Sequence, residues 1–122
     1  MSDAFEWIVP NQIMRVVLPE IFDDAKAQEH EVIITSYLDK ATHPFHIITD
    51  TRAVKVNPSL KVSTGLKYLK HPNMGRILTI GVTGNPLTRF LLSIFTRAVG
   101  TPVKDFSSED EALAYLAAIE KK

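Results

Sequence analysis

The apolar residues of the first forty positions follow two different spacings. Residues 4–9 and 12–18 are runs rich in β-branched and aromatic side chains, separated by a Pro-Asn pair, and this pattern predicts an antiparallel hairpin. Over residues 27–41, apolar side chains recur at intervals of three and four and fall within an arc of about 140°. This spacing predicts a helix over residues 23–40 with one face against a sheet.

Apolar runs and helical patterns alternate along the rest of the chain. Two Asn-Pro pairs, at 57–58 and 85–86, place a good N-cap before a proline at the first helical position. A Ser-Glu-Asp-Glu segment beginning at Ser108 has the spacing of a capping box. The most apolar run, 76–82, is predicted to form the centre of the sheet. The predicted strands are 45–49, 76–82 and 103–106, and the predicted helices are 57–69, 85–98 and a last one after Ser108, whose inner face is Ala112, Leu113, Leu116 and Ile119.

The resulting order of elements is ββαβαβαβα. Because strands and helices alternate, most strands are expected to be parallel and joined by right-handed crossovers. The fold class is therefore α/β, with a mixed, mostly parallel five-stranded sheet packed by four helices. A length of 122 residues with 45% apolar and 23% charged residues fits one globular domain spanning residues 1–122.

Composition removes several kinds of chemistry. The chain has no cysteine, which excludes disulfides, thiolate zinc sites and cysteine nucleophiles. Its first residues lack the basic start and apolar core of a signal peptide, and no apolar run is long enough to span a membrane. The expectation is a cytoplasmic protein with no integral membrane segment.

The net charge of zero hides a separation of charge along the chain. Residues 51–104 carry nine basic side chains and no acidic one, whereas the first fifty residues carry nine acidic and three basic ones. Complementary acidic and basic sides suit self-association, either head-to-tail or about a two-fold axis. No recognition-helix motif accompanies the basic stretch, so a nucleic-acid partner is not expected.

Three features together resemble a known family. They are the N-terminal strand pair, the strand that ends in aspartate (Phe-His-Ile-Ile-Thr-Asp, 45–50), and the closing segment Asp-Phe-Ser-Ser-Glu-Asp-Glu-Ala-Leu-Ala-Tyr-Leu (105–116). With the order of elements, they resemble the SpoIIAA-like proteins and the wider STAS domain group of anti-sigma-factor antagonists. The resemblance covers nearly the whole chain and implies the fold more than the function, because none of the matching segments is a catalytic motif. The family's role implied by it is that of a regulatory, protein-binding module.

Phosphorylatable STAS proteins carry a serine in an Asp-Ser-Ser-Gly-like motif at the start of the helix that follows the Asp-ending strand. Here that place reads Val-Asn-Pro-Ser-Leu, 56–60, so the motif is absent. Ser59 is the nearest positional counterpart, and its phosphorylation is a subordinate hypothesis. The sequence fits better the SpoIIAA-like relatives whose role is undefined or is thought to involve apolar ligands.

Ligands of parallel sheets bind beyond the carboxyl ends of the strands, and three segments of this chain are expected there. Asp50 and Arg52 follow one strand, Ser59 begins the next helix, and Thr83-Gly84-Asn85 lies between a strand and a helix, where free N–H groups suit an anion. The alternative for the glycine segment is a tight strand-to-helix turn. Asp50 could act as a general base; otherwise it caps loop amides and pairs with Arg52.

Two aromatic residues of the first predicted helix are further candidates. His30 and Tyr37 lie in its apolar arc, where they could line a pocket for an apolar or amphipathic molecule; the alternative for His30 is a satisfied core histidine. His43 and His46 are expected to point to opposite faces of their strand. We therefore expect no metal site and no cofactor.

The third predicted helix is more apolar than packing on a sheet requires. Its apolar side chains cover an arc of about 200°, where little more than 100° is typical. The surplus can be covered by the neighbouring helix, a second copy of the chain, or an apolar ligand. The interface candidates are Phe90, Leu91, Leu92, Phe95 and Val99. The sequence thus favours a non-enzymatic interaction or regulatory module that self-associates; the alternative is a protein that binds a small, lipid-like ligand, and an enzyme is a third possibility.

Overall fold

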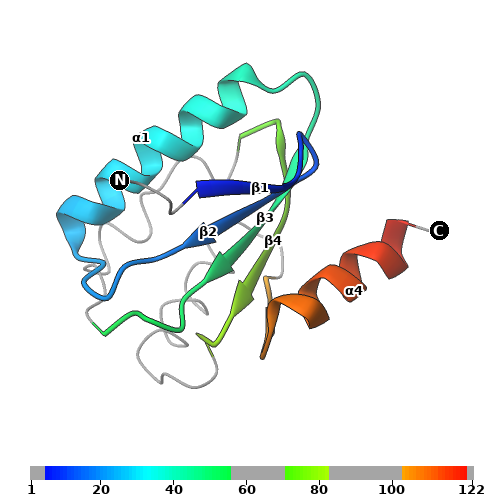
Figure 1. The fold of residues 1–122 in the computed structure, drawn as a ribbon. Coiled ribbons are helices and arrows are strands. Elements are labelled where there is room, and N and C mark those ends of the chain that lie inside the picture. Colours follow the sequence, from blue (N-terminus) through cyan, green and yellow to red (C-terminus); the bar gives the residue numbers. More distant parts are fainter. Residues whose placement is uncertain (1–4, 56–70, 83–102, 121–122) are drawn as a thin grey trace.

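The computed structural model describes residues 5–55, 71–82 and 103–120 (Figure 1). These residues form one five-stranded sheet in the order β1-β2-β3-β4-β5, together with two helices. The first pair of strands is antiparallel and the other three pairs are parallel, which confirms the α/β class and the mixed, mostly parallel sheet. The elements are β1 (Phe5–Val9), β2 (Ile13–Val17), α1 (Asp24–Lys40), β3 (Phe45–Asp50), β4 (Met74–Ile80), β5 (Lys104–Phe106) and α4 (Glu109–Glu120).

The predicted N-terminal hairpin is confirmed as β1 and β2. Its turn is closed by a hydrogen bond of 2.9 Å from the N–H of Gln12 to the carbonyl oxygen of Val9. Asn11 supplies the positive φ of 62° that the turn needs, a conformation that asparagine tolerates better than most residues.

The predicted first helix is confirmed as α1. The carboxylate of Asp23 caps it by accepting a hydrogen bond of 3.0 Å from the N–H of Lys26. Its buried residues, Ala27, His30, Ile34 and Leu38, recur at the intervals of three and four that the apolar arc predicted. This stripe joins α1 to one face of the sheet.

Among the described residues, two hydrophobic cores lie on the two faces of the sheet, under α1 and under α4 (Figure 1). Phe45 and Ile47 of β3 belong to the core with α1, whereas Ile48 belongs to the core with α4. The prediction of a strand covered on both faces is therefore confirmed for β3. In α4, Ala112 and Leu116 are buried, and Leu113 and Ile119 pack against the same core, as predicted for its inner face.

The fourth strand differs from its prediction in position and in bounds. The middle strand of the sheet is β3, and β4 lies one place from the edge, between β3 and β5. The strand is apolar because Leu78 and Ile80 pack under α4. Its apolar sequence does not mean that it is the middle strand of the sheet. The strand also begins earlier than residue 76, because Met74 pairs with Phe45. The predicted helices 57–69 and 85–98 lie outside the described residues.

The start of α4 is capped, but not by the exact box that the sequence predicted. Ser108 acts as N-cap, because its hydroxyl oxygen accepts a hydrogen bond of 3.3 Å from the N–H of Glu111. The carboxylate of Glu111 does not return to Ser108; it accepts hydrogen bonds from the N–H (3.1 Å) and the hydroxyl (2.7 Å) of Ser107. These bonds lower the pKa of Glu111 and fix the chain as it leaves β5.

Asn73 closes the opposite end of α1. Its side-chain amide donates hydrogen bonds of 3.0 Å and 3.1 Å to the carbonyl oxygens of Leu38 and Ala41, at the helix end where carbonyls lack the donor of a following turn. The Leu38 oxygen also accepts a hydrogen bond of 3.2 Å from the N–H of Ala41. We expect Asn73→Ala to lower the free energy of unfolding by about 1–2 kcal/mol, because both carbonyls lose a donor and Leu38 keeps only the N–H of Ala41. Asn73→Asp, which keeps the shape without the donors, should lose a similar amount.

Urea unfolding followed by circular dichroism measures this effect. Gln28→Ala, on the exposed side of α1, is the control and should change stability by less than about 0.5 kcal/mol. An Asn73→Ala variant as stable as the control would contradict the capping role.

Candidate functional site

The carboxyl ends of β3 and β4 are held together by the residue that leaves β3. Thr51 is buried, with 9% of its surface exposed. Its N–H donates to the carbonyl oxygen of Ile80 at 3.0 Å, and its hydroxyl donates to the same oxygen at 2.7 Å. The residues on either side, Asp50 and Arg52, are thereby fixed at the edge of the sheet where ligands of parallel sheets bind.

Asp50 and Arg52 form a two-armed ion pair. Nε of Arg52 donates to Oδ1 of Asp50 at 3.0 Å, Nη2 donates to Oδ2 at 2.7 Å, and the backbone N–H of Arg52 donates to Oδ1 at 3.0 Å. The side chain of Asp50 is 13% exposed and that of Arg52 is 56% exposed. The hydrogen bonds from the Arg52 side chain lower the pKa of Asp50 and raise that of the guanidinium. Such a carboxylate is a weak base, which disfavours the role of general base for Asp50.

Gly81 lets Arg52 lie across the end of β4. The glycine has φ +84°, and a Cβ placed on it would be 2.5 Å from Cγ of Arg52. Its N–H donates to the carbonyl oxygen of Phe106 at 3.0 Å, so its position is also fixed from β5. Any other residue here would strain the backbone and displace the stem of Arg52.

Asp105 ties the end of β5 to the end of β4. One carboxylate oxygen, Oδ1, accepts hydrogen bonds from the hydroxyl of Thr79 at 2.7 Å and from the N–H of Val82 at 3.0 Å. No motif or spacing in the sequence pointed to Asp105 as a site residue. Asp105 begins the segment 105–116, which was noted for other reasons. Its position in the sequence did not indicate a contact with β4.

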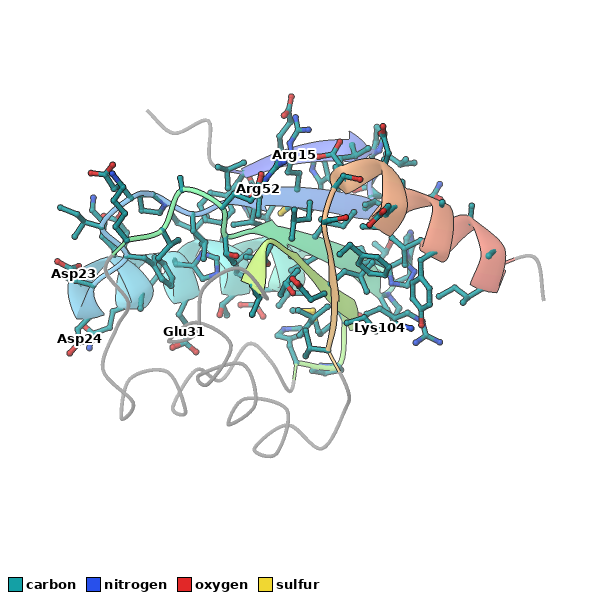
Figure 2. The ribbon with its side chains drawn as sticks, turned by 90° about the horizontal axis from the view of Figure 1, so that it is seen from below. Arg15, Asp23, Asp24, Glu31, Arg52 and Lys104 are labelled. Carbon is teal, nitrogen blue, oxygen red and sulfur yellow. The ribbon has the colours of Figure 1, made fainter. Side chains whose placement is uncertain are left out.

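Arg15 links the first two strands to α4. The sequence did not predict it as a site residue. From β2, its guanidinium donates to Oε1 of Glu109 at 2.7 Å and to the carboxylate of Glu6. The positive charge of Arg15 contributes to lowering the pKa of Asp50, and Glu109 contributes to raising that of Arg52. The two arginines therefore belong to one charged region (Figure 2). The signal in the sequence was a single charge inside the apolar run 12–18.

His30 and Tyr37 lie in the core on the α1 face. The ring of His30 packs against Phe5 and Phe22, with centroids 5.5 Å and 5.6 Å away, and the residue is 7% exposed. Burial lowers the pKa of His30 to about 4. Tyr37 packs against Phe5 and Trp7. These contacts place both residues on the other face of the sheet from the Arg15–Glu109 pair, and not with Asp50 and Arg52.

A surface hollow of about 790 Å³ follows the outward side of α1. Its lining includes the exposed side chain of Val32 between polar residues and contains neither His30 nor Tyr37. The residues of the described chain that line it are Gln28, Glu31, Val32, Thr35, Ser36, Asp39 and Lys40. The pocket that the sequence suggested around His30 therefore does not coincide with this hollow.

His46, in β3, and His71, in the loop before β4, have structural partners. Nδ1 of His46 accepts a hydrogen bond of 2.9 Å from the N–H of Arg76. His71 donates from Nε2 to Asp39 at 2.8 Å and accepts from the N–H of Asn73 at Nδ1. Across residues 5–55, 71–82 and 103–120, no group of three or more histidine or acidic side chains could hold a metal ion.

Several predicted site residues fall outside the described part of the chain and stay predictions. They are the ligand candidates Ser59, Thr83, Gly84 and Asn85 and the interface candidates Phe90, Leu91, Leu92, Phe95 and Val99. Neither α1 nor α4, the helices of the described part, is long and apolar enough to cross a membrane.

Comparison with known proteins found no family model, no curated protein and no solved structure that matches the chain. The function is therefore inferred from the residues of this chain and their geometry.

Proposed function

We propose that the chain is a cytoplasmic STAS-like regulatory module that acts by binding proteins, including a second copy of itself, and not by catalysis. The opening antiparallel hairpin and the sequential order of four parallel strands support this fold assignment. The two helices predicted at 57–69 and 85–98 complete the four-helix arrangement in this proposal.

The state of Asp50 is the observation that carries the non-catalytic part of the proposal. It is the carboxylate best placed for chemistry, at the carboxyl end of the central strand. Its two oxygens accept three hydrogen bonds from Arg52, so its lone pairs and its charge serve to hold the arginine. A residue in this state suits the recognition of a partner better than proton transfer.

The self-association part of the proposal rests on the third predicted helix and on charge. The helix carries an apolar arc of about 200°, roughly twice what a sheet covers. The acidic first fifty residues and the basic stretch 51–104 are complementary, which favours contact between two copies. Phe95 lies in the apolar arc and is the residue on which we expect the contact to depend most.

Sedimentation velocity at micromolar concentration tests this part. We expect the native chain to sediment as a dimer and Phe95→Asp as a monomer, because a buried carboxylate at the contact would have no partner. Val32→Asp is the matched control: it introduces the same charge at an apolar residue that is 70% exposed, and it should leave the dimer intact. A native chain that is a strict monomer would overturn the proposed self-association.

A further inference from the structure

We propose that Arg52 binds an anionic group, a carboxylate or a phosphate, of a partner protein, and that Asp50 and Gly81 are positioning residues that hold Arg52 for this contact. The inference rests on the proposed function only in assigning the anion to a protein. The anion-binding site itself is a property of the guanidinium and its surroundings.

Asp50 accepts hydrogen bonds from only part of the Arg52 guanidinium. An arginine carries five N–H donors in one plane, and Asp50 accepts from Nε and Nη2 only. Nη2 has one further N–H and Nη1 has two. Within residues 5–55, 71–82 and 103–120, none of these three N–H groups donates a hydrogen bond. Because the side chain is 56% exposed, these donors are accessible, and Nη1 and Nη2 together have the spacing that binds a carboxylate or a phosphate with two hydrogen bonds.

The position of this guanidinium is fixed before any partner arrives. Asp50, itself only 13% exposed, holds the Nε side, and the stem lies against Gly81, where a Cβ would come within 2.5 Å of Cγ. A free arginine side chain loses conformational entropy when it is immobilised. Here the fold has already restricted the side chain, so less of that cost falls on binding.

The charges nearby favour a directional contact over general attraction. Asp50 neutralises Arg52, and the neighbouring Arg15 is bound to Glu6 and Glu109. The two guanidinium groups of this region face three carboxylates, a net charge of −1, so an anion gains from hydrogen bonds to the arginine fork and not from excess positive charge. Affinity for a free ion should be weak, and it should depend on the guanidinium shape and not only on its charge.

The test is an NMR titration of the full-length chain at pH 7 and constant ionic strength, with inorganic phosphate in one series and acetate in the other. We expect the Nε–H signal of Arg52, and the backbone amide signals of Thr51 and Gly81 that the variants retain, to shift and saturate with at least one of the two ions. Arg52→Ala should weaken binding about tenfold or more, and Arg52→Lys should also lose most of it, because charge-assisted bonds from a two-armed donor are the strong ones. Arg76→Ala, which removes an exposed arginine near the start of β4, should bind as the native chain does.

The two ions distinguish the source of the anion. Saturation by phosphate alone supports a phosphorylated partner, and saturation by both supports carboxylates as well. The proposal is overturned if neither ion gives a saturating shift, or if Arg52→Lys binds as tightly as the native chain. A saturating shift in a chain that sediments as a monomer would uphold this site and overturn the self-association, whereas a dimer without the shift would overturn this site alone.

Discussion

Replacing Phe45 with alanine is expected to lower the free energy of unfolding by about 3–5 kcal/mol. Phe45 is 1% exposed, lies in the core between the sheet and α1, and packs edge-on against Trp7 with ring centroids 4.9 Å apart. The substitution removes the apolar contact and leaves a cavity that the neighbours fill only in part. Because domains of this kind are stable by about 5–15 kcal/mol in total, the variant should be close to its folding threshold.

Guanidinium unfolding followed by circular dichroism measures this loss. Phe45→Leu should recover part of it, since leucine fills more of the cavity than alanine. Val32→Ala, at a side chain that is 70% exposed, should change stability by less than about 0.5 kcal/mol. Equal midpoints for Phe45→Ala and Val32→Ala would show that β3 is not packed as described.

Acid is expected to destabilise the fold through His30. Burial lowers the pKa of His30 to about 4 in the folded chain, whereas an unfolded histidine titrates near 6.5. The unfolded state therefore binds the proton more tightly, so stability is complete above pH 6.5 and falls as the pH drops toward 4. The difference of pKa corresponds to about 3 kcal/mol at the acid limit and about 2 kcal/mol at pH 5.

A comparison of the native chain with His30→Phe isolates this effect. The free energy of unfolding of both proteins is measured from pH 7.5 to pH 4.5. Phenylalanine suits the aromatic surroundings formed by Phe5 and Phe22 and does not titrate. Carboxylates such as Asp50 contribute equally to both proteins, so the difference between the two curves reports His30. The curve of His30→Phe should be flatter by about 2 kcal/mol at pH 5. Parallel curves would mean that His30 is protonated with equal ease in both states.

Local spacing predicted much of the fold. The helix expected at 23–40 is α1 with Asp23 as its N-cap, and the hairpin, the strand ending at Asp50 and the last helix also occur where they were predicted. The place of a strand in the sheet follows from pairing between distant residues. Apolar content alone therefore misplaced β4, which is covered by α4 but is not central.

The strand-end site was predicted only in part, for the same reason. Asp50 and Arg52 are two residues apart, so their pairing was one of the alternatives that the sequence offered. The roles of Gly81 and Arg15 depend on contacts between residues that are distant in the sequence. Gly81, after β4, lies against the side chain of Arg52, and Arg15 of β2 binds Glu109 of α4. No spacing within the sequence encodes those contacts.

The two cores on opposite faces of the sheet can be followed by different optical signals. The chain has a single tryptophan, and Trp7 packs in the core under α1. In the core under α4, the aromatic pair is Phe106 and Tyr115, whose ring centroids are 5.4 Å apart. Loosening of α4 alone should change the near-ultraviolet tyrosine signal and leave tryptophan fluorescence almost constant. A folding assay that follows tryptophan fluorescence would therefore report the core under α1 and would detect little of the unfolding of the core under α4.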